Sequence, residues 1–362
     1  MRIFAQRALL PQGWAADVAI DVGPSGSIRV VTAGASRSRD DVPAGAIAPA
    51  MANLHSHAFQ RAMAGRGETS THDGDDFWTW REAMYALATT LEPDDLHRIA
   101  LEAYRAMLRA GYTTVAEFHY IHRDPRGAWY ADRCAPAEAL VAAAREAGIA
   151  ICLLPALYSQ ADPTGAALGA RQARFATSVD DVLGIAAEMR ARHRGDAGVV
   201  VGVCAHSLRA VPLAAFRELL AGSPAGVPVH LHVAEQEREV DDVRAALGAR
   251  PVDLLLDTFD VDERWCLVHA TQTTASELER IAAARATVGL CPTTEANLGD
   301  GLFALAPFLA SGGRFGIGSD SNVSISPIEE LRLLEYGQRL AHKRRVVARG
   351  GARSTGEALY AL

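Results

Sequence analysis

Histidines and an aspartate recur in this sequence at spacings that could bind a metal ion. His55 and His57 are separated by one residue, so in an extended segment their side chains point the same way. His232 and Asp320 each end a short apolar run much later in the chain. Three imidazoles with one carboxylate suit zinc, with iron as an alternative. The four residues therefore predict a site for a divalent ion.

Each of these residues also has an ordinary structural explanation. Two neighbouring histidines arise by chance, and an aspartate after a strand commonly caps the next helix. His230 lies two residues before His232 and faces the same side, but deeper in the expected strand. We leave His230 out of the predicted ligand set.

The elements that would position these residues alternate between strand and helix. Helical stretches at 93–110 and 136–147 each begin near a proline and stop before a glycine. Eight β/α alternations predict a (β/α)8 TIM-like barrel, whose active site lies at the carboxyl ends of the strands. The expected barrel strands span 46–54, 113–118, 149–157, 199–205, 227–233, 265–269, 286–290 and 314–318.

The first 45 residues have a different pattern. Residues 17–22 and 27–31 alternate polar and apolar side chains around a turn at 23–26. The sequence therefore predicts a small β accessory domain over 1–45, followed by a metal-dependent barrel over 46–362.

Composition excludes several classes of function. The net charge of −7 gives no basic surface for nucleic acid, and no run approaches the roughly 20 apolar residues of a membrane span. No signal-peptide pattern opens the chain. Five cysteines without a Cys-x-x-Cys pair favour reduced, buried thiols. We expect a cytoplasmic enzyme that acts on a small molecule.

The motif order resembles that of the amidohydrolase superfamily over about residues 46 to 345. His-x-His follows the first barrel strand, histidines follow the fifth and sixth, and an aspartate follows the eighth. Binuclear members commonly carry a carboxylated lysine after strand four, whereas the sole lysine here is Lys343. The resemblance therefore implies a mononuclear deaminase with one Zn²⁺ per subunit, or alternatively Fe²⁺, bound by His55, His57, His232 and Asp320.

Glu235 stands three residues after His232, too far along the chain to share the ion easily. It is placed to take a proton from zinc-bound water and to carry that proton to the leaving nitrogen. His269 and Asp320 are expected to orient the hydroxide and to stabilise the tetrahedral intermediate. Glu235 also suits the first turn of a helix, where the helix dipole favours a carboxylate.

A closer resemblance is to the formimidoylglutamate deiminases of bacterial histidine degradation. It rests on His-Ser-His-Ala-Phe-Gln-Arg within 49–65, and on 117–120, 205–209 and 232–236. The resemblance implies hydrolysis of N-formimidoyl-L-glutamate to N-formyl-L-glutamate and ammonia.

Five further residues suit a substrate with two carboxylates and an amidine-like group. Arg209 offers a bidentate fork for a carboxylate, and Arg81 offers a second one, although most arginines form surface ion pairs. Which arginine binds which carboxylate stays open. We interpret Phe77, Trp78 and Trp80 as packing residues. The predicted substrate contacts are Gln60, Arg81, Tyr120, His206 and Arg209.

The family normally completes its accessory domain, which is β-sandwich-like, with strands after the barrel. Residues 355–362 here resemble part of a helix, so we expect those strands to be missing. Pairing of such barrels through exposed helices suggests a homodimer. The alternatives are another mononuclear deaminase acting on a nucleobase or triazine, a non-catalytic metal-binding barrel and, less favoured because the lysine is missing, a binuclear peptidase or lactonase.

Overall fold

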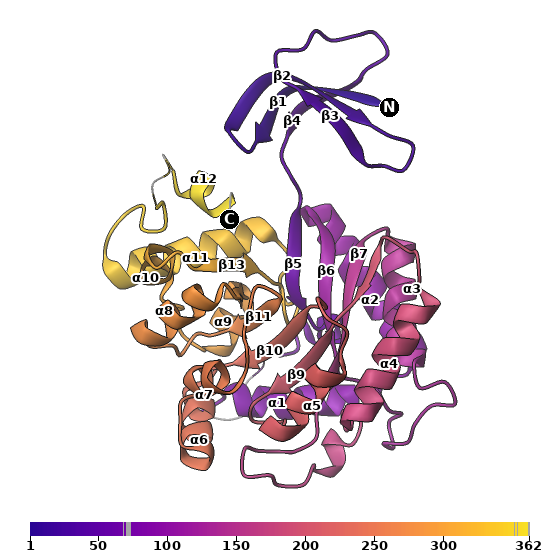
Figure 1. Cartoon of the computed structure of the whole chain (residues 1–362), viewed down its shortest axis with the longest axis vertical. Helices are drawn as coiled ribbons and strands as arrows, with labels where there is room; N and C mark the ends of the chain where they lie inside the picture. Colours follow the sequence, from indigo (N-terminus) through magenta and orange to yellow (C-terminus); the bar gives the residue numbers. More distant parts are fainter. Residues whose placement is uncertain (68, 70–73, 351, 353, 361–362) are drawn as a thin grey trace. The chain divides into compact units, whose positions relative to one another are not determined.

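The computed structural model describes residues 1–67, 69, 74–350, 352 and 354–360. They fall into two compact units, essentially Met1–Met51 and Ala52–Tyr360 (Figure 1). The smaller unit is a mixed four-stranded sheet in the order β3-β2-β1-β4. A few small apolar side chains, including Ala5 and Val18, form its core. The strands are β1 (Arg2–Leu10), β2 (Gly13–Val22), β3 (Ile28–Thr32) and β4 (Val42–Ile47).

The larger unit is a barrel of parallel strands, which confirms the predicted (β/α)8 class. Its strand order follows the chain from β5 to β13, and Ser56 bridges to Asp320 where the last strand meets the first. The bounds are β5 (Met51–Ser56), β6 (Tyr112–His119), β7 (Ala150–Leu157), β8 (Val199–Val201), β9 (Val203–Ser207), β10 (Val229–Val233), β11 (Trp265–His269), β12 (Thr287–Leu290) and β13 (Arg314–Ile317).

Helices lie along the outside of these strands (Figure 1). The predicted helices are confirmed as α2 and α3, which end at Gly111 and Gly148 in the left-handed conformation that glycine adopts without strain. The helices are η1 (Ala58–Met63), α1 (Phe77–Ala88), α2 (Pro93–Ala110), α3 (Ala135–Ala147), η2 (Ala170–Gln172), α4 (Val179–Arg192), α5 (Leu213–Gly222), α6 (Glu237–Leu247), α7 (Pro251–Thr258), α8 (Ala275–Ala284), α9 (Pro292–Leu298), α10 (Leu305–Ala310), α11 (Pro327–His342) and α12 (Thr355–Tyr360).

The continuous strand predicted over 199–205 is wrong at Gly202, where the chain divides into β8 and β9. A Cβ atom at Gly202 would lie 2.6 Å from the Pro228 carbonyl oxygen and 2.7 Å from a Leu154 methyl carbon. The chain therefore passes closer to its neighbours at this position than any other residue type allows, and β8 pairs with β7 alone.

Two other sequence expectations can be compared with the structure. All five cysteines are free thiols, and four of them are buried. The predicted C-terminal helical segment forms α12, whereas Ala361 and Leu362 lie outside the described residues. Among the described helices, none has both the length and the apolar character needed to cross a membrane.

Buried amides join the first and last barrel strands below the site. Asn53 donates to the Ser319 hydroxyl at 2.7 Å, and its carbonyl oxygen accepts from the backbone N–H of Ser319 at 3.1 Å. Asn322 donates to the backbone oxygen atoms of His57 and Asp320 at 3.2 and 2.9 Å. These bonds fix the segments that carry predicted metal ligands.

Candidate active site

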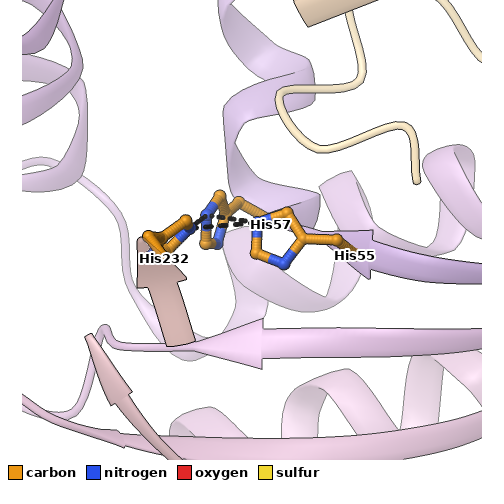
Figure 2. A group of neighbouring side chains, drawn as sticks. All are labelled: His55, His57 and His232. Carbon is orange, nitrogen blue, oxygen red and sulfur yellow. Dashed lines mark hydrogen bonds between the residues drawn. The ribbon is translucent and has the colours of Figure 1, made fainter. Parts of the chain in front are cut away.

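Three imidazoles meet at the carboxyl ends of the barrel strands. His55 is the second-last residue of β5, His57 lies just beyond that strand, and His232 lies in β10. Their Nε2 atoms are 3.1 to 3.2 Å apart, although 175 residues of chain separate His57 from His232. Figure 2 shows the three rings converging from these two parts of the barrel. The three residues form a candidate metal-binding group.

Backbone carbonyls select the tautomer of two of these rings. The Nδ1 atom of His57 lies 2.9 Å from the Phe118 carbonyl oxygen, and that of His232 lies 2.8 Å from the His206 carbonyl oxygen. A carbonyl can only accept, so each Nδ1 carries the proton and each Nε2 keeps a free lone pair. Both lone pairs are therefore available to a cation.

Asp320 supplies a carboxylate beside the same rings. Its Oδ1 atom lies 3.3 Å from Nε2 of His55 and 3.5 Å from Nε2 of His57. Burial opposes ionisation of Asp320, but the neighbouring imidazoles outweigh it and hold its pKa below the ordinary range. Burial lowers the pKa of His55 to about 4. Neutral imidazoles beside an ionised carboxylate are the protonation states that a divalent cation requires.

The backbone at this end of the barrel is strained. Ala234, His269, Ala270, Asp320 and Asn322 all have φ between +42° and +68°, a region that residues other than glycine seldom adopt. His269 is the last residue of β11, and the other four follow β10, β11 or β13. Such strain persists where surrounding contacts impose it, and it concentrates at functional sites.

Two acidic residues flank His269. Oε1 of Glu235 lies 3.7 Å from Nε2 of His269, and Oε1 of Glu295 lies 3.3 Å from Nδ1. Glu295 also accepts the backbone N–H of Cys291 at 2.8 Å, which fixes its position. Burial disfavours protonation of His269, but the surrounding carboxylates outweigh it and raise its pKa. Burial raises the pKa of Glu235 to about 7, which suits a group that both accepts and donates a proton.

A cavity beside these groups is lined by His57, His232, Glu235, His269 and Asp320. It also holds every predicted substrate contact: Gln60, Arg81, Tyr120, His206 and Arg209. Groups suited to a metal ion and groups suited to a substrate therefore line one cavity.

The predicted neutral contacts stand next to the imidazoles. Gln60 donates to the Tyr120 hydroxyl at 2.9 Å, and its own carbonyl oxygen is buried without a partner among the described residues. The His206 ring lies 4.9 Å from that of His232. This part of the cavity therefore offers both an acceptor and an aromatic wall.

The two predicted arginines leave buried donors unpaired. Arg209 is 7% exposed, and its Nε and Nη1 atoms have no partner among the described residues. Nε of Arg81 is likewise unpaired, and its guanidinium carbon lies 4.5 Å from the Trp78 ring centre. Buried guanidinium donors are costly without an acceptor, so this wall of the cavity is built for an anion.

Sequence reasoning missed much of the cavity wall. Helix α1 contributes Phe77 and Trp80, which we had interpreted only as packing residues, together with Met84 and Tyr85. Tyr158, after β7, also lines the cavity. The capping box of Asp76 and Thr79 starts α1 at this position and was a readable signal for the helix. No sequence signal indicated that the helix faces the cavity.

Comparisons with known proteins agree on the kind of molecule. Residues 46–357 match the model of the amidohydrolase family, and residues 1–45 match the N-terminal domain of formimidoylglutamate deiminase HutF. The chain is 48% identical to the formimidoylglutamate deiminase of Pseudomonas aeruginosa, over 95% of this chain and 76% of that protein.

Similar structures and more distant sequences extend the comparison. The crystal structure of an amidohydrolase from Brucella melitensis superimposes with a TM-score of 0.97 at 46% identity, covering 99% of this chain and 80% of that one. A 5-methylthioadenosine/S-adenosylhomocysteine deaminase of Pelotomaculum thermopropionicum is 25% identical, over 86% of this chain and 65% of that protein.

Proposed function

The chain belongs to the amidohydrolase family, in the group of formimidoylglutamate deiminases, and we propose that it hydrolyses N-formimidoyl-L-glutamate to N-formyl-L-glutamate and ammonia. One observation carries the proposal: unpaired, buried guanidinium donors and a metal-type histidine cluster line the same cavity. The carboxylates of that substrate can bind the guanidinium donors, and its hydrolysable formimidoyl group can lie at the histidine cluster.

We propose a single divalent ion, zinc or alternatively iron, with His55, His57, His232 and Asp320 as ligands. The fixed tautomers of His57 and His232 and the ionised Asp320 fit such an ion. When bound, it supplies an activated water at neutral pH and polarises the substrate.

Glu235 moves the protons of the reaction. Water adds to the formimidoyl carbon, and the Glu235 carboxylate accepts the proton that the water loses. That proton passes to the terminal imino nitrogen, which becomes an amine. Glu235 then carries the proton of the newly added hydroxyl group to the same nitrogen, the C–N bond breaks as the formyl C=O bond forms, and ammonia leaves. His269, held by Glu295, directs Nε2 towards Glu235 and Asp320, where it stabilises the charge that develops during addition.

Arg209 and Arg81 bind the substrate carboxylates, while Tyr120, His206 and Gln60 contact the segment nearer the imidazoles. A nucleobase or triazine presents no carboxylate, so it would leave both arginines with unpaired, buried donors. This cost makes the nucleobase alternative less favourable for this cavity. Glu235 lies 3.7 Å from His269, where both side chains could take part in proton transfer, and this argues against a barrel that only binds metal and has no catalytic activity.

The proposal is tested by measuring ammonia release from N-formimidoyl-L-glutamate with zinc-loaded protein, and by identifying N-formyl-L-glutamate by mass spectrometry. Glu235→Gln should lower kcat by about 10²- to 10⁴-fold while zinc content is unchanged. Absence of the formyl product from the wild-type reaction would overturn the proposal. The predicted homodimer is tested separately, by light scattering.

A further inference from the structure

Two tyrosines and a glutamine at the arginine wall have no role in the function proposed above. Tyr85 on α1 and Tyr158 after β7 both line the cavity, and their hydroxyl oxygens are 3.3 Å apart. The buried side chain of Gln172 donates from Nε2 to the Tyr158 hydroxyl at 2.9 Å and to the Tyr85 hydroxyl at 3.4 Å. The three polar groups form one hydrogen-bonded cluster.

The orientation of the Gln172 amide is fixed from its other side. The backbone N–H of Gly169 donates to Oε1 of Gln172 at 2.9 Å. An N–H can only donate, so the atom facing Gly169 is the oxygen and the atom facing the tyrosines is the NH₂ group. Gln172 therefore acts only as a donor towards both hydroxyls.

Counting protons within this cluster leaves one unused. Each tyrosine hydroxyl accepts from Gln172 and carries a single proton of its own. The hydrogen bond between the two hydroxyls consumes one of these protons. The described residues give no acceptor for the other one, and both hydroxyls belong to residues that line the cavity. One phenolic O–H is thus left for a ligand.

The surroundings indicate which ligand would accept it. The Arg81 guanidinium carbon lies 5.4 Å from the Tyr85 ring centre, and unpaired donors of Arg81 and Arg209 line the same cavity. A carboxylate satisfies guanidinium and phenol donors together. Burial raises the pKa of Tyr85, so its hydroxyl keeps its proton at any ordinary pH.

The tyrosine pair stands away from the imidazole cluster. The Tyr158 ring packs on His206 at 4.7 Å, and His206 in turn packs on His232 at 4.9 Å. One ring layer therefore separates Tyr158 from His232, and the Tyr85 hydroxyl lies 3.3 Å from the Tyr158 hydroxyl. In N-formimidoyl-L-glutamate the side-chain carboxylate is the group farthest from the formimidoyl carbon.

We propose that the Tyr85–Tyr158 hydroxyl pair, oriented by Gln172, hydrogen-bonds the side-chain carboxylate of the substrate and thereby selects for an acidic side chain. The inference rests on the proposed function, because it assigns a subsite to that substrate. Both tyrosines are specificity-determining residues, and the arginines supply the charge that draws the carboxylate to them.

The test compares Tyr85→Phe, Tyr158→Phe and the double variant with wild type, all zinc-loaded. Calorimetric titration measures the Kd of N-formyl-L-glutamate and of N-formyl-L-norvaline, which has a methyl group in place of the side-chain carboxylate. Tyr112→Phe is the matched control, since its buried hydroxyl stands at the start of β6 and outside the cavity lining. Titration needs no turnover, so a failure of the proposed reaction is scored separately by ammonia release.

The double variant should weaken binding of N-formyl-L-glutamate by about 10- to 100-fold, as expected for a hydrogen bond to a charged group. Binding of the norvaline compound should change less than about threefold, and Tyr112→Phe should leave both values as in wild type. Equal weakening of both compounds, no weakening of either, or no binding of N-formyl-L-glutamate to wild type would overturn the inference.

Discussion

The two ends of the cavity differ in how their buried polar groups are paired. At the imidazole end, protein groups orient three of the rings: carbonyl oxygens hold His57 and His232, and Glu295 holds His269. Nδ1 of His55 and the carbonyl oxygen of Gln60 lack a partner there among the described residues. At the arginine end, donors of Arg81 and Arg209 have no partner among the described residues. The first end is preorganised for a reaction, whereas the second is completed by its ligand.

This difference explains why specificity and chemistry can be separated in this cavity. Preorganised groups contribute to the transition state because they need not reorganise during the reaction. Unpaired donors instead penalise any ligand that lacks matching acceptors. Variants at the two ends should therefore differ in what they change, with kcat sensitive at one end and discrimination between ligands at the other.

The largest effect is expected for His232→Asn. Loss of one of the converging imidazoles should remove stoichiometric zinc and lower ammonia release by more than about 10³-fold. Metal analysis and kinetics measure both quantities. His230→Asn is the matched control, because His230 is buried in the same strand but does not belong to the converging group. Retention of zinc by His232→Asn would contradict the ligand assignment.

A smaller effect is expected at the other end for Arg209→Met, which removes a guanidinium and keeps an unbranched apolar chain. kcat/KM for N-formimidoyl-L-glutamate should fall by roughly 10- to 100-fold, mainly through KM, while zinc content stays constant. Steady-state kinetics measures the change, with the exposed Arg98→Met as control. A fall confined to kcat would place Arg209 in the chemical step and break the distinction between the two ends.

Glu295→Gln tests whether the imidazole end depends on the fixed orientation of His269. The substitution preserves size and an acceptor for Cys291 but removes the charge beside Nδ1. We expect kcat to fall about 10-fold with little change in KM. The control Glu277→Gln alters another buried carboxylate, which pairs with Arg250 outside the cavity lining. Unchanged kinetics in Glu295→Gln would remove its positioning role.

The smallest effect on activity is expected for Glu330→Gln. Glu330 lies on α11 and accepts hydrogen bonds from Thr293 on α9, outside the cavity lining, so the substitution tests stability rather than catalysis. Burial raises the pKa of Glu330 to about 8, although its bonds to Thr293 oppose the shift. Because the folded state keeps this proton while an unfolded glutamate loses it near pH 4.5, wild-type stability should decline from pH 5 to pH 8.

Denaturant unfolding of wild type and Glu330→Gln at pH 5 and pH 8 measures this dependence. In wild type the free energy of unfolding should fall by an amount on the order of 2 kcal/mol between these pH values, and in the variant this fall should be absent. The variant should release ammonia at nearly the wild-type rate. An identical decline in both proteins would show that Glu330 does not cause it.

The imidazole end could be predicted from sequence because its candidate metal ligands occur in short, local sequence patterns. His55 and His57 lie two residues apart, His232 and Asp320 each follow an apolar run, and the barrel brings such strand ends to one rim. The number and order of the strands followed from the same periodicity. Two strand predictions were wrong. The strand expected over 46–54 is divided between β4 of the small sheet and β5 of the barrel. The break at Gly202 was missed because it depends on a contact with Pro228.

The arginine end was only half predictable, because its wall combines residues that no local pattern connects. Arg209 follows β9 and was readable as a rim residue, but Tyr85 and Trp80 face the cavity only because α1 packs over it. Gln172 acts through an amide orientation that Gly169 determines. Such roles arise from tertiary packing and hydrogen-bond direction, which a single sequence does not contain.

The central claim is that one cavity couples preorganised hydrolytic groups to donors that require a dicarboxylate. It is tested most directly by presenting zinc-loaded wild-type protein with N-formimidoyl-L-glutamate and with a panel of purines and pyrimidines, and by measuring kcat/KM for ammonia release from each. We predict release from N-formimidoyl-L-glutamate, with every nucleobase at least about 10³-fold poorer, as expected when buried polar groups are left unpaired. Release from a nucleobase at an equal or higher kcat/KM would contradict the claim.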